Sequence, residues 1–590
     1  MSKVIVFATP VFLLMIALEY LWGRRRAARG TGTDTYRLND ALNSISLGVL
    51  SQLCAAMSKL LTIGIYTSVF AAVALYPQLE FWNTWYGWLI ALVFYDFCYY
   101  WLHRAGHEVA VCWAFHVVHH QSQQYNLSTA LRQTSSGALL GWIFYLPMAV
   151  AGVPPQIFAV VAIIDLLYQF WYHTEHVGKL GWFDRVWGSP SNHRVHHAVN
   201  AQYLDRNYGG MLMLWDHLFG SFQEETEPCV YGTRSPLRSW DPLWANAEVY
   251  WTLARDAWRT ERWADKLRVW FMPPGWQPAD LAAADPKPVF RLEAVTPYDP
   301  PLTRAQQWFA ALQFVVSLGA VSVFLWSADS LAGDEAAVWV AAITAAMWAQ
   351  GLFLQGRLAM AEVLLLECAV LATLAAAGML GLPGGFDPLL LFKPLPMAIA
   401  ILFVAPGLGK STATGLFEPK TTGRLLLLAA LAFALAGDIA LMLPGDHFVT
   451  GLGLFLVTHL LYLALFRQGA AWFPQRAALW GSLALGALMY ALLWQPLAEP
   501  VLRLAVAAYI TAICLMVAQA LGCASATGDS HARWAAAGAC VFMASDTLIA
   551  VDRFLTPLPW APVWILTSYF AAQMLIVHHG RWLYWRRTPF

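Results

Sequence analysis

Charged residues are scarce in this sequence and closely spaced cysteine pairs are absent from it, and each of these features excludes a class of protein to which the chain could belong. Only 12% of the 590 residues are charged and 59% are hydrophobic, which excludes an ordinary soluble protein. The 36 basic and 36 acidic residues balance, so nucleic acid is not an expected partner. The eight cysteines form no C-x2-C pair, which argues against a disulfide framework or a cysteine metal site. The composition predicts an all-α, polytopic membrane protein.

Histidine is the residue that the sequence does concentrate. Ten of its 16 histidines lie between residues 103 and 197, in the patterns H-x3-H, H-x2-H-H, H-x2-H and H-x2-H-H. Because a helix brings residues three or four apart onto one face, each group can present its imidazoles toward one point. The ten predicted metal ligands are His103, His107, His116, His119, His120, His173, His176, His193, His196 and His197.

The ligand type indicates which metal the groups hold. Imidazole suits iron, zinc and copper, and redox chemistry with positions open to oxygen favours iron. The zinc motif H-E-x-x-H is absent, because no histidine stands three residues after Glu108. Any single histidine is more simply an ordinary polar-loop residue, but ten in this spacing predict a non-haem di-iron oxygenase that uses O2.

The apolar runs place these histidines on one side of the membrane. An anchor at residues 4–22 is followed by Arg24, Arg25 and Arg26, which predicts that the chain continues on the cytoplasmic side. Runs at 44–75 and 85–102 are expected to cross twice, and those at 137–153 and 157–172 to form a hairpin broken by Pro154 and Pro155. All four groups then meet in a cytoplasmic cap.

The histidine segment resembles the fatty acid hydroxylase and sterol desaturase superfamily of membrane di-iron enzymes. The stretches W-L-H-R-A-G-H-E (101–108), F-H-V-V-H-H (115–120) and S-N-H-R-V-H-H (191–197) are most similar to alkylglycerol monooxygenase, whose pattern does not require His176. The resemblance implies hydroxylation of the carbon next to an alkyl ether oxygen, with tetrahydrobiopterin as a possible electron donor. Glu108 and Asp205 are candidates for orienting the imidazoles.

After Pro301 the chain becomes almost continuously apolar. Ten runs have about the 17 to 25 residues that a bilayer requires. They lie near residues 307–326, 337–354, 358–380, 388–404, 425–443, 449–466, 478–494, 502–521, 534–551 and 562–579. The predicted domains are a di-iron hydroxylase with cap and linker at 1–300, connecting transmembrane helices at 301–385 and a second helical bundle at 386–590.

Two aspartates stand inside these apolar runs. Asp438 and Asp546 each cost on the order of 2.5 to 3.5 kcal/mol to insert, so they need a reason to be there. Lys393, His459 and Tyr569 accompany them. Hydrogen bonding between helices for packing alone is one explanation, and a reaction site is the other.

This region resembles the YhhN-like lysoplasmalogenase family. The matching stretches are F-K-P-L-P (392–396), G-D-I (437–439), S-D-T-L-I-A (545–550) and Y-F-A-A-Q-M-L-I (569–576). The resemblance assigns catalytic roles to Asp438 and Asp546, with Lys393 as a further candidate. A vinyl ether is hydrolysed by protonation of its β carbon and attack of water on the cation, which one protonated and one ionised carboxyl can support.

The two resemblances together predict an integral membrane enzyme of ether lipids and lysoplasmalogens, with an external electron donor. One alternative is a hydroxylase or desaturase of sterols, fatty acyl chains or carotenoids, with a non-catalytic or lipid-binding carboxyl-terminal bundle. The other is a metal transporter or sensor without enzymatic activity, which predicts metal ligands inside the membrane spans.

Overall fold

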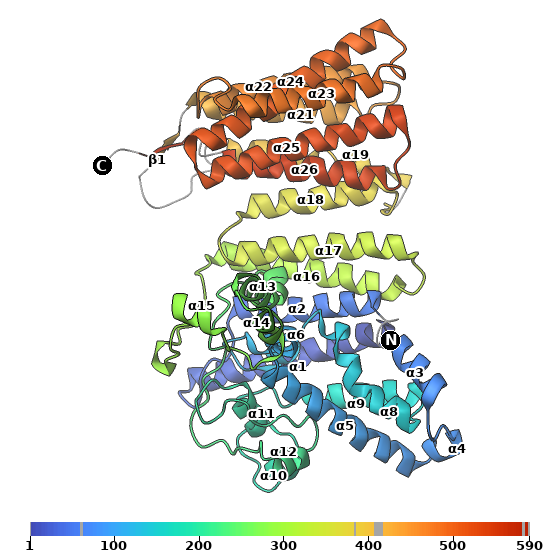
Figure 1. The fold of residues 1–590 in the computed structure, drawn as a ribbon, viewed down its shortest axis with the longest axis vertical. Coiled ribbons are helices and arrows are strands. Elements are labelled where there is room, and N and C mark those ends of the chain that lie inside the picture. The colour runs from blue at the N-terminus through green and yellow to red at the C-terminus, as the bar shows by residue number, and fades with distance from the viewer. Residues whose placement is uncertain are drawn as a thin grey trace. The chain divides into compact units, whose positions relative to one another are not determined.

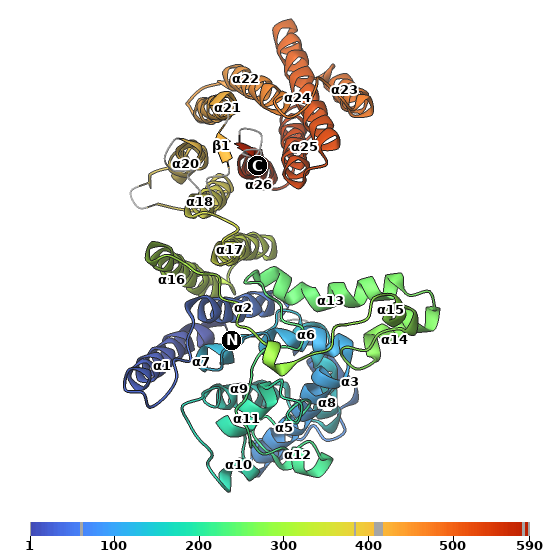
Figure 2. The same ribbon diagram turned by 90° about the vertical axis from the view of Figure 1, so that its left-hand side faces the viewer.

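The computed structural model describes residues 2–58, 63–382, 385–405, 417–419, 421–580 and 585–587. Helices make up most of these residues (Figures 1 and 2), which confirms the all-α class. The strands found among the described residues are β1 (Phe417–Pro419) and β2 (Trp585–Arg587), which pair antiparallel. The chain divides into two compact units, Met1–Arg357 and Leu358–Phe590. The finer division at residues 300 and 385 stays a prediction.

The amino-terminal unit surrounds the histidine segment with helices from both sides of it in sequence. Its helices are α1 (Ser2–Ala28), α2 (Leu38–Met57), α3 (Ile65–Val73), α4 (Leu79–Trp82), α5 (Trp85–Glu108), α6 (Ala110–His120), α7 (Leu127–Ala130), α8 (Leu146–Ala151), α9 (Pro155–Phe170), α10 (Phe183–Val186), α11 (Pro190–His197), α12 (Leu214–Phe219), α13 (Pro242–Arg259), α14 (Trp263–Phe271), α15 (Ala279–Ala284), α16 (Arg304–Ser327) and α17 (Gly333–Leu354). Helix α2 packs against α16 and α17 on one side and against α7 on another.

Capping residues explain where the histidine-bearing helices begin. The Thr84 side chain accepts a hydrogen bond from the amide of Gly87 and starts α5. The Ser189 side chain accepts one from the amide of Asn192 and starts α11, whose first residue is Pro190. These signals are local in sequence, so both helices start at positions that the chain itself specifies.

The close approach of α2 to the loop after α7 depends on Gly48. A Cβ atom at residue 48 would lie 2.1 Å from the backbone carbonyl oxygen of Leu131, which cannot move away as a flexible side chain could. We therefore expect Gly48→Ala to destabilise the amino-terminal unit by about 1 to 3 kcal/mol. Thermal unfolding of the purified protein measures this, with Gly319→Ala in α16 as the matched control because no heavy atom lies within 4 Å of its added Cβ. Equal midpoints for the two variants would contradict the expectation.

Nine helices among the described residues are long and apolar enough to cross a membrane. They are Ile5–Ala28, Arg304–Ser327, Gly333–Leu354, Thr422–Ala440, Phe448–Arg467, Arg476–Leu493, Pro500–Thr527, Ser530–Leu555 and Ala561–Gly580. The expectation of a multi-pass membrane protein is confirmed. Eight of the ten runs expected after Pro301 are in this set, whereas 358–380 and 388–404 form shorter helices.

The predicted crossing at residues 44–75 is wrong as a single segment. Helix α2 ends at Met57 and α3 begins at Ile65, and residues 59–62 lie outside the described part of the chain. Helix α2 also buries Asn39, Asp40 and Asn43. Its polar side chains serve hydrogen bonds inside the unit, so α2 is less apolar than a lipid-facing span.

The carboxyl-terminal unit is a helical bundle built on small residues. Its helices are α18 (Met360–Ala376), α19 (Pro388–Phe392), α20 (Leu395–Val404), α21 (Thr421–Ala440), α22 (Phe448–Arg467), α23 (Arg476–Leu493), α24 (Pro500–Thr527), α25 (Ser530–Ala550) and α26 (Ala561–Gly580). Figure 1 shows α25 and α26 side by side, and Ala535, Ala539 and Ala572 are buried in the core cluster that these helices share. Small residues let helix backbones approach closely in lipid.

Candidate functional site

Nine of the ten predicted histidines converge in the amino-terminal unit. Helix α5 supplies two of them, α6 three and α11 three, and His173 follows the end of α9. Their ring nitrogens form two groups, in each of which one nitrogen per residue lies within 4.8 Å of all the others. The first group is His103, His107, His116, His120 and His196, and the second is His119, His173, His193 and His197.

Backbone carbonyls fix the orientation of four of these rings. The Nδ1 atoms of His103 and His119 lie 2.8 Å from the carbonyl oxygen of Tyr208 and 2.9 Å from that of Arg132. Those of His173 and His196 lie 2.8 Å from the Gln169 carbonyl oxygen and 3.0 Å from that of Arg206. A carbonyl only accepts, so each Nδ1 carries the proton and each Nε2 keeps a free lone pair.

The Nε2 atoms face one another at distances that suit a shared cation. In the first group, Nε2 of His120 lies 3.0 Å from that of His116 and 3.2 Å from those of His107 and His196. Two nitrogens that bind one ion at about 2.1 Å and at a right angle lie about 3.0 Å apart. Facing lone pairs repel each other without a cation, so the donor set fits two bound metal ions.

The second group has the same geometry. Nε2 of His173 lies 3.2 Å from that of His119 and 3.0 Å from that of His193. Nε2 of His197 lies 3.1 Å from both His119 and His193. Burial lowers the pKa of His119 to about 4 and holds the pKa of His193 well below its usual range, which keeps both imidazoles neutral and able to bind metal.

Two buried polar residues hold the carbonyls that orient the rings. The guanidinium of Arg132 donates to the carbonyl oxygen of Val118 and to the Asn43 side chain, at 2.7 and 2.9 Å, and is 1% exposed. Asp216 is fully buried and accepts hydrogen bonds from the amides of Tyr208 and Gly209, each at 2.7 Å. The loops that bear the orienting carbonyls are thus fixed by charged groups away from the metal positions.

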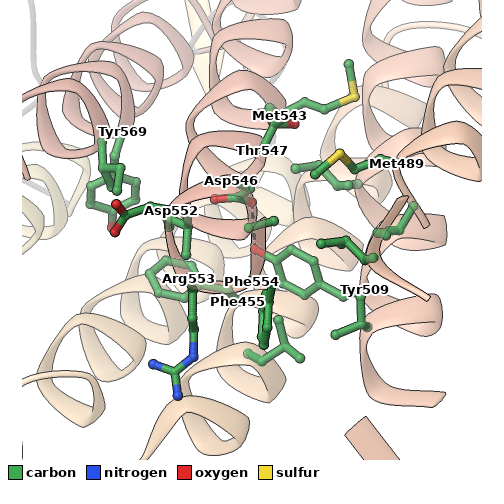
Figure 3. A pocket seen from close by; sticks show the side chains of 18 of the residues that line it. Phe455, Met489, Tyr509, Met543, Asp546, Thr547, Asp552, Arg553, Phe554 and Tyr569 are labelled. Carbon is green, nitrogen blue, oxygen red and sulfur yellow. Dashed lines mark hydrogen bonds between the residues drawn. The ribbon is translucent and has the colours of Figure 1, made fainter. Parts of the chain in front are cut away.

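A second candidate site is a cavity of about 430 Å³ inside the carboxyl-terminal unit (Figure 3). Most of its lining is apolar, with Phe455, Met489 and Met543 among the side chains. Lys393, Asp438 and Asp546, the three predicted catalytic residues, also line it. A mostly apolar wall with a few polar groups suits a lipid chain whose reacting end meets the carboxylates.

Asp438 and Asp546 each accept a hydrogen bond from a tyrosine. The Tyr569 hydroxyl donates to Oδ2 of Asp438 at 2.7 Å, and Nζ of Lys393 lies 3.8 Å from Oδ1 of the same carboxylate. The Tyr509 hydroxyl donates to Oδ2 of Asp546 at 2.6 Å, as Figure 3 shows for these two residues. The two carboxyl groups therefore differ in their surroundings, because only Asp438 lies beside the ammonium group of Lys393.

A buried histidine completes the surroundings of Asp546. His459 is 0% exposed, and its Nε2 lies 3.2 Å from Oδ2 of Asp546 and 2.9 Å from the Tyr509 hydroxyl oxygen. Its Nδ1 is buried and makes no hydrogen bond. The carboxyl, phenol and imidazole form one contact network from α25, α24 and α22.

Comparisons with known proteins match a segment of each of the two units. The fatty acid hydroxylase family model matches residues 88–221, and the YhhN family model matches residues 389–579. An alkylglycerol monooxygenase from Danio rerio is 33% identical over 398 residues, which are 67% of this chain and 86% of that protein. The chain belongs to the alkylglycerol monooxygenase family. The human alkylglycerol monooxygenase is 39% identical over 271 residues, or 46% of this chain and 59% of the human protein.

The carboxyl-terminal unit of this alkylglycerol monooxygenase family member is similar to a second kind of enzyme. The lysoplasmalogenase TMEM86B from Sus scrofa is 34% identical over 188 residues, which are 32% of this chain and 72% of that protein. No solved structure matches the chain. The predicted fusion of a fatty acid hydroxylase domain with a lysoplasmalogenase-like domain is confirmed.

One of the ten predicted metal ligands of the monooxygenase unit lies away from the two histidine groups. His176 belongs to neither histidine group, and its Nε2 lies 3.4 Å from the Thr35 hydroxyl. Glu108 points to Arg104, at 2.9 Å, and not to an imidazole. Asp205 does face a ligand ring, with Oδ1 3.6 Å from Nδ1 of His107.

The sequence alone did not indicate several residues that shape the two candidate sites. Asp216 and Arg132 hold the carbonyls that orient His103 and His119, and Tyr509 contacts Asp546. An aspartate within the D-H-L-F-G-S-F stretch (216–222) is a readable signal for the first. A tyrosine in an apolar helix is not such a signal, because a buried tyrosine ordinarily packs its ring and finds a hydrogen-bond partner for its hydroxyl without any further role.

Proposed function

We propose that the amino-terminal unit is a di-iron monooxygenase that hydroxylates the carbon next to the ether oxygen of alkylglycerol lipids. The two groups of facing Nε2 atoms carry this proposal, since nine imidazoles at such distances provide a cage for two ions. The nine proposed iron ligands exclude His176. They also lie outside the nine candidate membrane spans, whereas a transporter predicts ligands within spans.

Iron bound to these imidazoles supplies the activation of O2 and the removal of hydrogen from the substrate carbon. One oxygen atom enters the carbon–hydrogen bond, the other leaves as water, and two electrons and two protons come from an external donor, which we propose is tetrahydrobiopterin. The hemiacetal formed separates into an aldehyde and a free glycerol hydroxyl. The backbone carbonyls of Tyr208, Arg132, Gln169 and Arg206 keep Nδ1 of four ligands protonated and their Nε2 directed inward.

For the carboxyl-terminal unit we propose hydrolysis of the vinyl ether of lysoplasmalogens. Lys393 favours the ionised form of Asp438, which stabilises the oxocarbenium ion and activates the attacking water. Asp546 protonates the β carbon of the vinyl ether, and Tyr509 and His459 hold its carboxyl group in place. Water adds to the cation, and the hemiacetal that forms separates into an aldehyde and the free hydroxyl of a glycerophosphate headgroup that no longer carries a chain.

The placement of the site on the membrane is also a proposal. The arginines that follow the first candidate span, Arg24, Arg25 and Arg26, favour a cytoplasmic location for the histidine cap. The soluble electron donor then reaches the metal centre from the cytosol.

The test is the reaction of the purified, iron-loaded full chain with each lipid. We expect fatty aldehyde from 1-O-alkylglycerol only with O2 and tetrahydrobiopterin, and aldehyde from 1-alkenyl lysolipid without either. Hydroxylated sterol or acyl products with untouched alkylglycerol would overturn the first activity. Release of no aldehyde from the 1-alkenyl lysolipid would overturn the second.

A further inference from the structure

The rim of the carboxyl-terminal cavity is formed by an unusual turn. Helix α25 widens at its end into a π-helical turn, Val551–Leu555. Three consecutive residues of this turn, Asp552, Arg553 and Phe554, line the cavity. Consecutive residues of a regular α-helix point in widely different directions, and π-helical turns occur frequently at functional sites.

Charges of both signs meet at this rim. Nη2 of Arg553 lies 3.3 Å from both carboxylate oxygens of Asp446, in the loop between α21 and α22. The guanidinium lies over the Phe448 ring, with its carbon 4.2 Å from the ring centroid. The side chains of Arg553 and Asp446 are 44% and 75% exposed, so ions in solution can reach both. In Figure 3 the guanidinium points away from the Asp546 carboxylate.

The rim and the reacting carboxylates are spaced like the two ends of a lysophospholipid head. Asp546 on α25 and Asp552 in the π-helical turn that follows it are six residues apart, which corresponds to a rise of at most about 9 Å. Six bonds separate the vinyl ether carbon of a lysoplasmalogen from its phosphorus atom. An extended chain advances a little over 1 Å per bond, so the separation is about 7 Å. With the vinyl ether beside Asp546, the phosphate reaches the rim.

We propose that Arg553 binds the phosphate of a zwitterionic lysophospholipid while Asp446 and Asp552 attract its ammonium group. This inference rests on the proposed vinyl ether hydrolysis and assigns residues to the headgroup of its phospholipid substrate. The rim lies at the ends of candidate spans, where headgroups meet water, and the apolar cavity wall receives the chain. Arg553 is a specificity residue and takes no part in the chemical step.

The experiment compares two vinyl ethers with the full-length protein in detergent. One is a 1-alkenyl lysophosphatidylethanolamine, and the other is the matching 1-alkenylglycerol, which lacks phosphate and amine. For Arg553→Gln we expect the ratio of kcat/KM values, phospholipid over alkenylglycerol, to fall at least tenfold through a higher KM for the phospholipid. Arg476→Gln, which removes an exposed arginine from the start of α23, is the matched control and should keep the wild-type ratio.

Asp446→Asn separates recognition from a purely structural ion pair. If Arg553 only anchors the turn, the Arg553→Gln and Asp446→Asn variants lose activity on both substrates equally, and the proposal is overturned. If it binds phosphate, Asp446→Asn keeps more phospholipid activity than Arg553→Gln, because the guanidinium remains. A wild-type chain that cleaves neither vinyl ether refutes the proposed hydrolase function, which is a different result from cleavage with an unchanged ratio.

Discussion

Replacing His120 with alanine is expected to remove iron from the protein and to abolish aldehyde release from alkylglycerol. Nε2 of His120 contacts Nε2 of His107, His116 and His196, so its loss opens the first group at its most connected position. Its ring also lies 4.3 Å from that of His197 in the second group. Removing groups that merely orient a ligand already costs about 10 to 100-fold in metal affinity, so loss of a ligand should cost at least about 100-fold.

Iron content by elemental analysis and oxidation of alkylglycerol are the two readouts for His120→Ala. His176→Ala is the matched control, because His176 lies outside both groups and should leave the iron content at the wild-type level. Thermal unfolding of the purified full chain reports whether each variant is folded. Full iron content in His120→Ala, or equal iron loss in His176→Ala, would contradict the assignment of the two histidine groups as the iron ligands.

Asp546→Asn is expected to eliminate vinyl ether hydrolysis and to leave alkylglycerol oxidation intact. Asparagine keeps an oxygen that can accept the hydrogen bond from Tyr509, but it has no acidic proton to give to the vinyl ether carbon. General acid catalysis contributes about 10² to 10⁴-fold, so a fall in kcat of that size is expected. Aldehyde release from 1-alkenyl lysolipid measures it.

Tyr509→Phe is the graded companion to this variant. It removes the hydroxyl that donates to Asp546 and leaves the carboxyl, so hydrolysis should fall by less than in Asp546→Asn. Asp438→Asn should also abolish hydrolysis, because the charge beside Lys393 is lost. Near wild-type hydrolysis in Asp546→Asn would show that the two carboxyls serve packing alone.

The metal site was largely readable from the sequence because its chemistry lies in side chains at local spacings. His193, His196 and His197 sit on one short helix, and the four-residue interval between His193 and His197 places both rings in the second group. The atoms that orient the rings were not readable. They are backbone carbonyls, such as those of Tyr208 and Arg132, and every residue type carries such an oxygen.

The second site was readable only where a charge stood in an apolar run. Asp438 and Asp546 were found because an ionisable group in a span is costly, and the structure places both at one cavity. Tyr509 contacts Asp546 from a helix 37 residues away in sequence. Only the packing of α24 against α25 brings the two together, and no local pattern encodes it.

The membrane spans of the amino-terminal unit were the weakest part of the prediction. Hydrophobicity joined residues 44–75 into one run, although α2 ends at Met57. Ser44 and Ser46 are buried in α2, so a helix of mixed composition packs within the unit there. The apolar content of a segment measures its hydrophobicity, but it does not show whether the segment is buried against protein or exposed to lipid.

The apolar wall and charged rim of the cavity also bear on how its products depart. In the proposed hydrolysis, cleavage divides the lysophospholipid into a long-chain aldehyde and a glycerophosphoamine. The aldehyde keeps the whole hydrocarbon chain, and each buried methylene favours partitioning into the membrane by about 0.8 kcal/mol. We therefore expect the aldehyde to leave laterally into the hydrocarbon core of the bilayer. The polar fragment loses its tether and diffuses into the aqueous phase from beside Arg553. The two products therefore leave the cavity toward different phases, the aldehyde toward the lipid and the polar product toward water. The empty cavity can then bind the next substrate.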